Sequence, residues 1–176
     1  MIAMLNEHRS WAVLLILCCW LQAGPTQAQV MGDEAELDRL KGKAEDALAN
    51  EDAEGAAMSM GRAALMAAHL ARKESGSERA TLFKGLEHLF RSQEHGYRAM
   101  ALFRRAGGSL PASAGVCGSV QLGELELQHT KVSLEQLSVV PESSQPVSAK
   151  VAALKQGVEE WGTVLAAIRA DYQCVQ

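Results

Sequence analysis

The sequence predicts an all-α protein, an antiparallel bundle or a stack of helical hairpins with about five helices. Three observations point to this class. Alanine and leucine are abundant, whereas aromatic residues make up only 5% of the chain. Proline occurs at only four positions, so long stretches of helix can continue without interruption. Apolar residues also recur at helical spacing along most of the chain.

The first 28 residues have the three regions of a signal peptide. A short polar stretch contains Arg9, an apolar run covers residues 11–21, and small residues at Thr26 and Ala28 suit a signal peptidase. The apolar run is shorter than the about 20 residues that a membrane-spanning helix needs. We therefore predict cleavage after Ala28, a periplasmic or secreted protein with no stable membrane span, and one helical domain over residues 29–176. A buried N-terminal helix and an uncleaved anchor are the alternatives.

Helices in the first half of this domain are predicted from periodicity and capping residues. The first is expected over residues 33–49 and the second over residues 53–73, with Asn50 or Asp52 as the N-cap of the second. A helical stretch over residues 78–106 then starts at Ser77, which is a suitable N-cap, and ends at two glycines.

The second half of the domain is predicted to form a long helical hairpin. After a start near Pro111, apolar residues alternate at spacings of four and three in two stretches, 116–137 and 147–175, which is the pattern of left-handed helix packing. The short linker between them makes the two helices antiparallel neighbours. Cys117 and Cys174 then lie at the same end, and we predict a disulfide between them, although helix rise leaves a mismatch of about 10 Å.

Residues 80–111 carry a more specific pattern of large and small side chains. Its members are Phe83, Leu86, Phe90, Ala99, Phe103, Ala106 and Pro111. This spacing resembles the tetratricopeptide repeat, a helix–turn–helix unit of 34 residues, although Glu87 stands where the family usually has glycine. The resemblance implies a scaffold that binds peptides or other proteins on a concave face.

The same stretch is also consistent with one long helix of a bundle. In that alternative a single apolar stripe continues through it, and Glu94, His95 and Gly96 lie inside the helix instead of forming the turn of a repeat. Both alternatives remain open at the level of the sequence.

Metal-ligating residues are scattered. Glu126 and His129 form one Glu-x-x-His pair on one helix face, but a di-iron bundle needs two such pairs and two further carboxylates, so we interpret the pair as a polar helix face. Met58, Met66 and His69 offer thioether and imidazole groups that suit copper, although methionine is also a common filler of cores. No metal site or cofactor is predicted.

The predicted function is therefore non-catalytic binding of another exported protein or peptide, at a surface that includes Phe83, Phe90 and Phe103. The alternative is a helical-bundle carrier of a small molecule or of a metal such as copper. An enzyme is disfavoured because the sequence contains no phosphate loop, nucleophile elbow or haem-attachment motif. Nucleic acid is an unsuitable partner for a chain of net charge −4 without a basic stretch.

Overall fold

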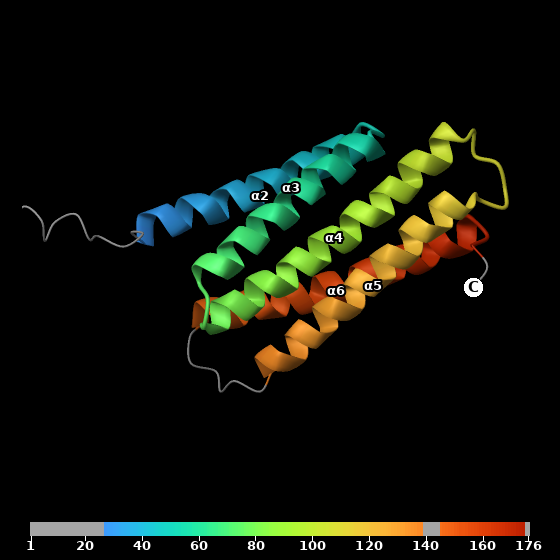
Figure 1. Cartoon of the computed structure of the whole chain (residues 1–176). Coiled ribbons are helices and arrows are strands. Elements are labelled where there is room, and N and C mark those ends of the chain that lie inside the picture. The colour runs from blue at the N-terminus through green and yellow to red at the C-terminus, as the bar shows by residue number, and fades with distance from the viewer. Residues whose placement is uncertain (1–26, 139–144, 175–176) are drawn as a thin grey trace, which may run out of the picture. The chain divides into compact units, whose positions relative to one another are not determined.

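Figure 1 shows the computed structural model of the protein, which describes residues 27–138 and 145–174. Residues 33–176 form one compact unit, and of the residues before it the structure describes only 27–32, in the first turns of a helix. The described residues contain no strand and form five α-helices, α2 (Gln27–Ala49), α3 (Ala53–Lys73), α4 (Glu78–Arg105), α5 (Ala114–Ser138) and α6 (Gln145–Asp171). The predicted all-α class is confirmed.

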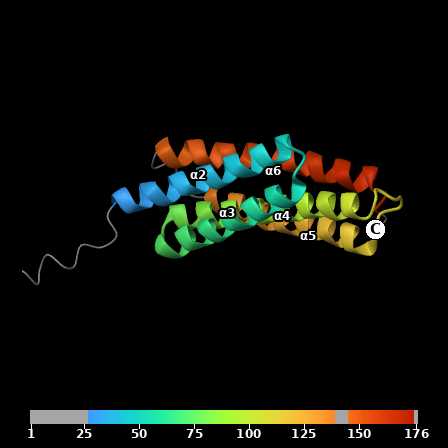
Figure 2. The same ribbon diagram turned by 90° about the horizontal axis from the view of Figure 1, so that it is seen from above.

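The helices of the compact unit form two layers. In Figure 2, α3, α4 and α5 lie side by side in chain order, and α2 and α6 cover one side of them. The central helix is α4, which contacts α3, α5 and α6. The opposite side of the three-helix layer is covered by no other helix of the described residues. Side chains that point to that side are therefore available to a ligand or a partner.

Side-chain caps start two helices at the predicted residues. Asp52 accepts a hydrogen bond from the backbone N–H of Gly55 at 2.8 Å, and Ser77 accepts one from Ala80 at 3.2 Å. Each cap satisfies a backbone donor that has no partner within its helix. At its other end α4 stops before Gly107, whose φ of 77° lies in the left-handed region that glycine enters without strain. The bounds predicted for α3 are confirmed, and those of α4 differ by one residue.

Three other helix ends differ from the prediction. Helix α2 begins at Gln27, six residues earlier than predicted. Helix α5 begins at Ala114 and not near Pro111, because the hydroxyl of Ser113 accepts a hydrogen bond from the N–H of Val116 at 3.4 Å and so caps the helix there. Helix α6 ends at Asp171, four residues before the end of the apolar pattern.

The apolar pattern of α6 supplies the contact with α4. Leu154, Trp161 and Leu165 are buried in the main hydrophobic core. Gly96 of α4 makes room for the indole, since a Cβ atom at this position would lie 2.6 Å from Cζ2 of Trp161. The indole also packs edge-to-face on Tyr97, with ring centroids 5.0 Å apart. The packing of Trp161 against α4 therefore depends on the absence of a side chain at Gly96.

Residues 78–105 form one uninterrupted helix. Of the two alternatives left open by the sequence, the structure has the long helix of a bundle, and Glu94, His95 and Gly96 lie inside α4. The turn that a tetratricopeptide repeat would place at these residues is not formed. The physical reason is the burial of Gly96 and Tyr97 against α6, which fixes this segment as helix and outweighs the intrinsic cost of a glycine within it.

A disulfide joins Cys117 to Cys174, as predicted, with the two Cα atoms 5.4 Å apart. The expected mismatch in helix length is absent because α6 stops at Asp171. The chain then turns back, and the N–H of Cys174 donates to the carbonyl of Arg169 at 3.0 Å. The bond therefore connects the start of α5 to a turn that follows α6.

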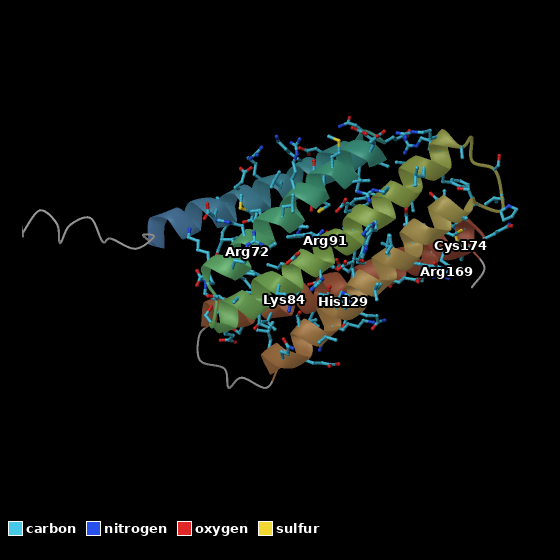
Figure 3. The ribbon with its side chains drawn as sticks, viewed as in Figure 1. Arg72, Lys84, Arg91, His129, Arg169 and Cys174 are labelled. Carbon is cyan, nitrogen blue, oxygen red and sulfur yellow. A yellow bond between two sulfur atoms is a disulfide. The ribbon has the colours of Figure 1, made fainter. Side chains whose placement is uncertain are left out.

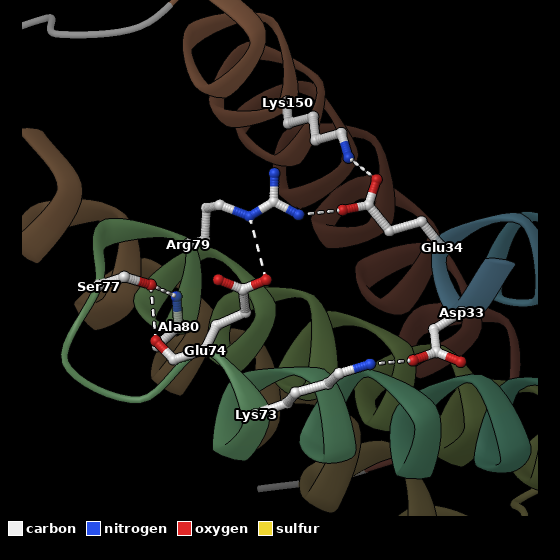
Figure 4. A network of polar contacts seen from close by, with 8 residues as sticks. All are labelled: Asp33, Glu34, Lys73, Glu74, Ser77, Arg79, Ala80 and Lys150. Atoms are coloured by element: carbon white, nitrogen blue, oxygen red, sulfur yellow. Dashed lines mark hydrogen bonds and ion pairs between the residues drawn. The ribbon is translucent and has the colours of Figure 1, made fainter. Parts of the chain in front are cut away.

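The start of the compact unit is held by ion pairs, which Figure 4 shows at close range. Asp33 of α2 pairs with Lys73 of α3 at 2.9 Å, and Glu34 pairs with both Arg79 of α4 and Lys150 of α6. Asp33 and Glu34 therefore connect α2 to three other helices.

The predicted leader lies outside the described residues, except for its last two positions, Gln27 and Ala28, which are in the first turn of α2. Among the described residues, no helix combines the length and the apolar character that crossing a membrane requires.

Candidate functional site

Two of the three phenylalanines predicted to form an interaction surface lie in the interior. Phe83 and Phe90 are 1% and 3% exposed and belong to the main core, so neither presents an exposed side chain to a partner. Their spacing of seven residues places both on the side of α4 that other helices cover. Phe103 is half-buried and stacks on Tyr172, with ring centroids 3.9 Å apart, next to the disulfide.

A groove on the uncovered side of α3 and α4 does present exposed apolar side chains. It is a hollow of about 570 Å³. Two large apolar side chains of α3 line it while remaining mostly in solvent, Met58 at 57% and Leu65 at 62% exposed. They are seven residues apart and therefore lie on one stripe of the helix. Ala57 and Leu102 are further apolar residues of its lining.

Four arginines surround these apolar side chains. Arg91, Arg98 and Arg105 follow one another at intervals of seven residues along α4, and Arg62 faces them from α3. Figure 3 labels Arg91 on α4. The groove contains two carboxylates, so its lining has an excess of positive charge although the chain as a whole has a net charge of −4.

Three of these arginines already have an acidic neighbour. Arg98 pairs with Glu94, Arg105 pairs with Glu54 at 2.7 Å, and Arg91 pairs with a glutamate one turn earlier in α4. A guanidinium group has five N–H donors, so each retains donors for a further carboxylate. Arg62 has no ion-pair partner among the described side chains.

The groove follows from the close contact of α3 with α4. A Cβ atom at Gly61 would lie 3.1 Å from the carboxylate of Glu94, so the glycine leaves space for this side chain between the helices. Because the two helices are antiparallel, Glu54 meets Arg105 at one end and Leu65 lies near Arg91 at the other. From residue 91 to residue 105, α4 rises about 21 Å, which equals the length of about four helical turns.

Met58, Met66 and His69 do not gather at one hollow. Met58 lines the groove between α3 and α4, whereas Met66 and His69 line a second hollow together with residues of α2. Met58 and Met66 are also separated by about 12 Å of helix rise. A copper ion held by all three residues is therefore not favoured by this arrangement.

A different set of potential metal ligands comes together between α4 and α5. His88 of α4 lies beside Glu126 and His129 of α5, and one ligand atom from each residue is within 4.8 Å of the other two. Figure 3 labels His129 on α5. The sequence pattern had identified the pair on α5, but it gave no sign of the residue on α4.

The contact of α4 with α5 explains why His88 meets this pair. The hydroxyl of Ser92 donates to the carbonyl of Gly123 at 2.7 Å, and a Cβ atom at Gly123 would lie only 3.2 Å from the backbone of Ser92. From this point, one turn back along α4 leads to His88 and one turn forward along α5 leads to Glu126. Antiparallel helices therefore place the two side chains opposite each other.

His95 lies two turns beyond His88 on the same side of α4. Burial lowers the pKa of His95, with smaller effects of Glu94 and Glu126, which raise the pKa, and of Arg98 and Arg91, which lower it. Its Nδ1 atom is buried without a hydrogen-bond partner among the described residues. We therefore expect the folded protein to hold this imidazole in its neutral form near pH 7.

Comparison of the chain with models of protein families, with curated proteins and with solved structures found no match.

Proposed function

We propose that the protein binds an acidic, amphipathic helix of another exported protein along the groove between α3 and α4. The observation that carries this proposal is the pairing of two exposed apolar side chains, Met58 and Leu65, with the arginines that flank them. Exposed apolar groups framed by charged residues are typical of sites that receive an amphipathic helix. Export rests on the leader predicted from residues 1–28.

The dimensions of the groove define the partner segment. A length of about 21 Å accommodates roughly 14 residues of helix. Apolar residues spaced by three and four along that segment would cover Met58 and Leu65. Acidic residues on its two flanks would face Arg62 on one side and Arg91 and Arg98 on the other. Planar guanidinium groups bind carboxylates through two parallel hydrogen bonds, which favours Asp and Glu over other polar residues.

Charge and apolar burial are both needed for stable binding. Complete burial of a leucine or methionine side chain is worth about 1.5–3 kcal/mol, and Met58 and Leu65 are little more than half exposed, so together they contribute about 2–4 kcal/mol. A micromolar complex requires about 8 kcal/mol. The remainder has to come from the arginines and from apolar groups of the partner, and we expect the affinity to fall as ionic strength rises.

Site-specific photo-crosslinking tests the proposal. A photoreactive amino acid at position 65 should capture a partner when the protein is expressed in its native compartment, and the same group at position 155, an exposed position of α6, should not. Mass spectrometry of the captured peptide should identify an acidic segment with helical apolar periodicity. The variant Arg62→Glu should reduce the yield at position 65, whereas Lys155→Glu should leave it unchanged.

Three results would contradict the proposal. They are equal capture at both positions, capture of a basic or non-periodic segment, and capture of only a second copy of the same chain. The last result would identify the groove as a contact between copies.

A further inference from the structure

We propose that His88, Glu126 and His129 form a binding site for a divalent transition-metal ion of the zinc type. The three side chains come from two helices and offer two imidazoles and one carboxylate. None of the three lines the groove between α3 and α4. A test of the metal site is therefore independent of a test of the proposed partner.

The positions of the ligand atoms are close to those that a metal needs. Nδ1 of His88 lies 2.7 Å and Nδ1 of His129 lies 3.7 Å from the same carboxylate oxygen of Glu126. The two imidazole rings are 5.0 Å apart between centroids. Ligands at 2.0–2.2 Å from a tetrahedral zinc ion are roughly 3.3 Å from one another. The separations of 2.7 Å and 3.7 Å from the Glu126 oxygen are therefore within about 0.6 Å of the tetrahedral value.

The type of ligand selects the type of metal. Imidazole nitrogen combined with carboxylate oxygen suits zinc and its neighbours among the divalent first-row metals. Magnesium and calcium prefer sites made of oxygen alone, and copper(I) prefers sulfur, which this cluster lacks. Two histidines and one glutamate are also a ligand set of zinc ions that keep a fourth position for water.

The surroundings leave room for that fourth ligand. The side chains of His88 and Glu126 are about one-fifth exposed, whereas that of His129 is 49% exposed and forms the outer edge of the cluster. An ion held here would have protein on its inner side and solvent on its outer side.

The site is supported by a rigid backbone. All three residues lie inside helices, and α4 and α5 are fixed to each other one turn away by the hydrogen bond from Ser92 to Gly123. Sites built on helices hold their ligands more precisely than sites on loops. The ligands therefore need little reorganisation to bind the ion.

The competing interpretation is a hydrogen bond between His88 and Glu126 that serves only to join the two helices, with His129 as an exposed neighbour. The two interpretations differ in the role of His129. In the structural interpretation its removal has no consequence for metal affinity, whereas a metal ligand cannot be lost without a large effect.

Isothermal titration calorimetry of the untagged, disulfide-bonded protein with zinc chloride distinguishes the two interpretations. We expect one zinc ion per chain. Loss of a group that merely supports a metal ligand costs 10–100-fold in affinity, so His129→Ala and Glu126→Gln, which each remove a direct ligand, should weaken binding by at least about 100-fold. The matched control is His69→Ala, because this exposed histidine lies on α3 outside the cluster. Thermal melting of each metal-free variant shows whether it folds.

The exposed position of His129 keeps the test valid even where Glu126→Gln fails to fold, since truncation at the surface leaves the core unchanged. The proposal is overturned if the wild-type protein shows no saturable binding up to about 1 mM zinc. It is equally overturned if His129→Ala binds as tightly as wild type, or if His69→Ala loses as much affinity as His129→Ala.

Discussion

Replacing Gly96 with alanine tests the packing of Trp161 of α6 against α4. The new methyl group would lie 2.6 Å from Cζ2 of Trp161 and 3.2 Å from Cδ2 of Leu165. Both neighbours are buried, and the indole is a rigid ring held against Tyr97, so it cannot move aside cheaply. Overpacking of a core costs about 1–3 kcal/mol, and we expect the upper part of that range, about 2–3 kcal/mol.

A second contribution has the opposite sign. Alanine is favoured over glycine inside a helix by about 1 kcal/mol. The net effect of Gly96→Ala is therefore a loss of about 1–2 kcal/mol in the free energy of unfolding. Gly42, inside α2, is the matched control, because a Cβ atom there would have no neighbour within 4 Å. Gly42→Ala should stabilise the protein by up to about 1 kcal/mol, so the difference between the two variants isolates the steric cost.

Urea unfolding followed by circular dichroism measures both variants. With a slope of about 2 kcal/mol per molar urea, the midpoint of Gly96→Ala should fall by about 0.5–1 M, and that of Gly42→Ala should rise by up to about 0.5 M. If Gly96→Ala proves as stabilising as Gly42→Ala, then the indole of Trp161 does not occupy the space beside residue 96 and the packing described for α4 and α6 is wrong.

Three further predictions concern stability. Replacing Cys117 and Cys174 together by serine should lower the free energy of unfolding by about 4 kcal/mol, from the loop entropy of a separation of 57 residues. The thermal midpoint should therefore fall, and an unchanged midpoint would refute the prediction. Asp52→Ala, which removes the cap of α3, should cost about 1 kcal/mol in urea unfolding, and Asn50→Ala, whose side chain caps no helix start, should cost less. Burial lowers the pKa of His95 in the folded state, so the unfolded chain binds a proton at this residue more readily than the folded protein does. The free energy of unfolding therefore falls as the pH drops through about 6.5. In His95→Gln the urea midpoint should fall less between about pH 7.5 and 5.5 than it does in the wild type; an equal fall would show that His95 is not responsible.

Helix periodicity and capping residues were sufficient to predict most of the fold. The start and end of α3 follow from Asp52 and from the apolar stripe, and the disulfide follows from the antiparallel order of α5 and α6. The length of α4 could not be decided in this way. A glycine inside a helical pattern is compatible with a turn or with close packing, and only the position of Trp161, 65 residues later, distinguishes the two.

The candidate sites were harder to predict because they depend on which side of a helix is covered. Phe83 and Phe90 share a stripe, but periodicity does not reveal whether that stripe faces solvent or another helix. Met58 looked like core filler for the same reason, and the neighbouring Met60 is indeed buried. The intervals of seven between Arg91, Arg98 and Arg105 were the available signal for the groove.

The metal ligands illustrate a second limit. Glu126 and His129 are three residues apart and visible as a pair, whereas His88 is separated from Glu126 by 38 positions along the chain. Their contact depends on the register between α4 and α5, which is fixed by Ser92 and Gly123. A glycine on the apolar stripe of α5 hints at close helix contact, but it does not identify the residue opposite.

The dissociation constant of the partner captured through position 65 tests the proposed function most directly. It should be measured for the wild-type protein, for Leu65→Glu, and for Leu125→Glu. The last variant alters a leucine of α5 that is also more than half exposed. Leu65→Glu replaces an apolar contact by a charge facing an acidic partner, and a loss of at least 1.4 kcal/mol weakens binding about tenfold or more. We predict that result together with unchanged binding by Leu125→Glu. Wild-type affinity in Leu65→Glu, with binding lost in Leu125→Glu, would contradict the account and move the binding surface to α5.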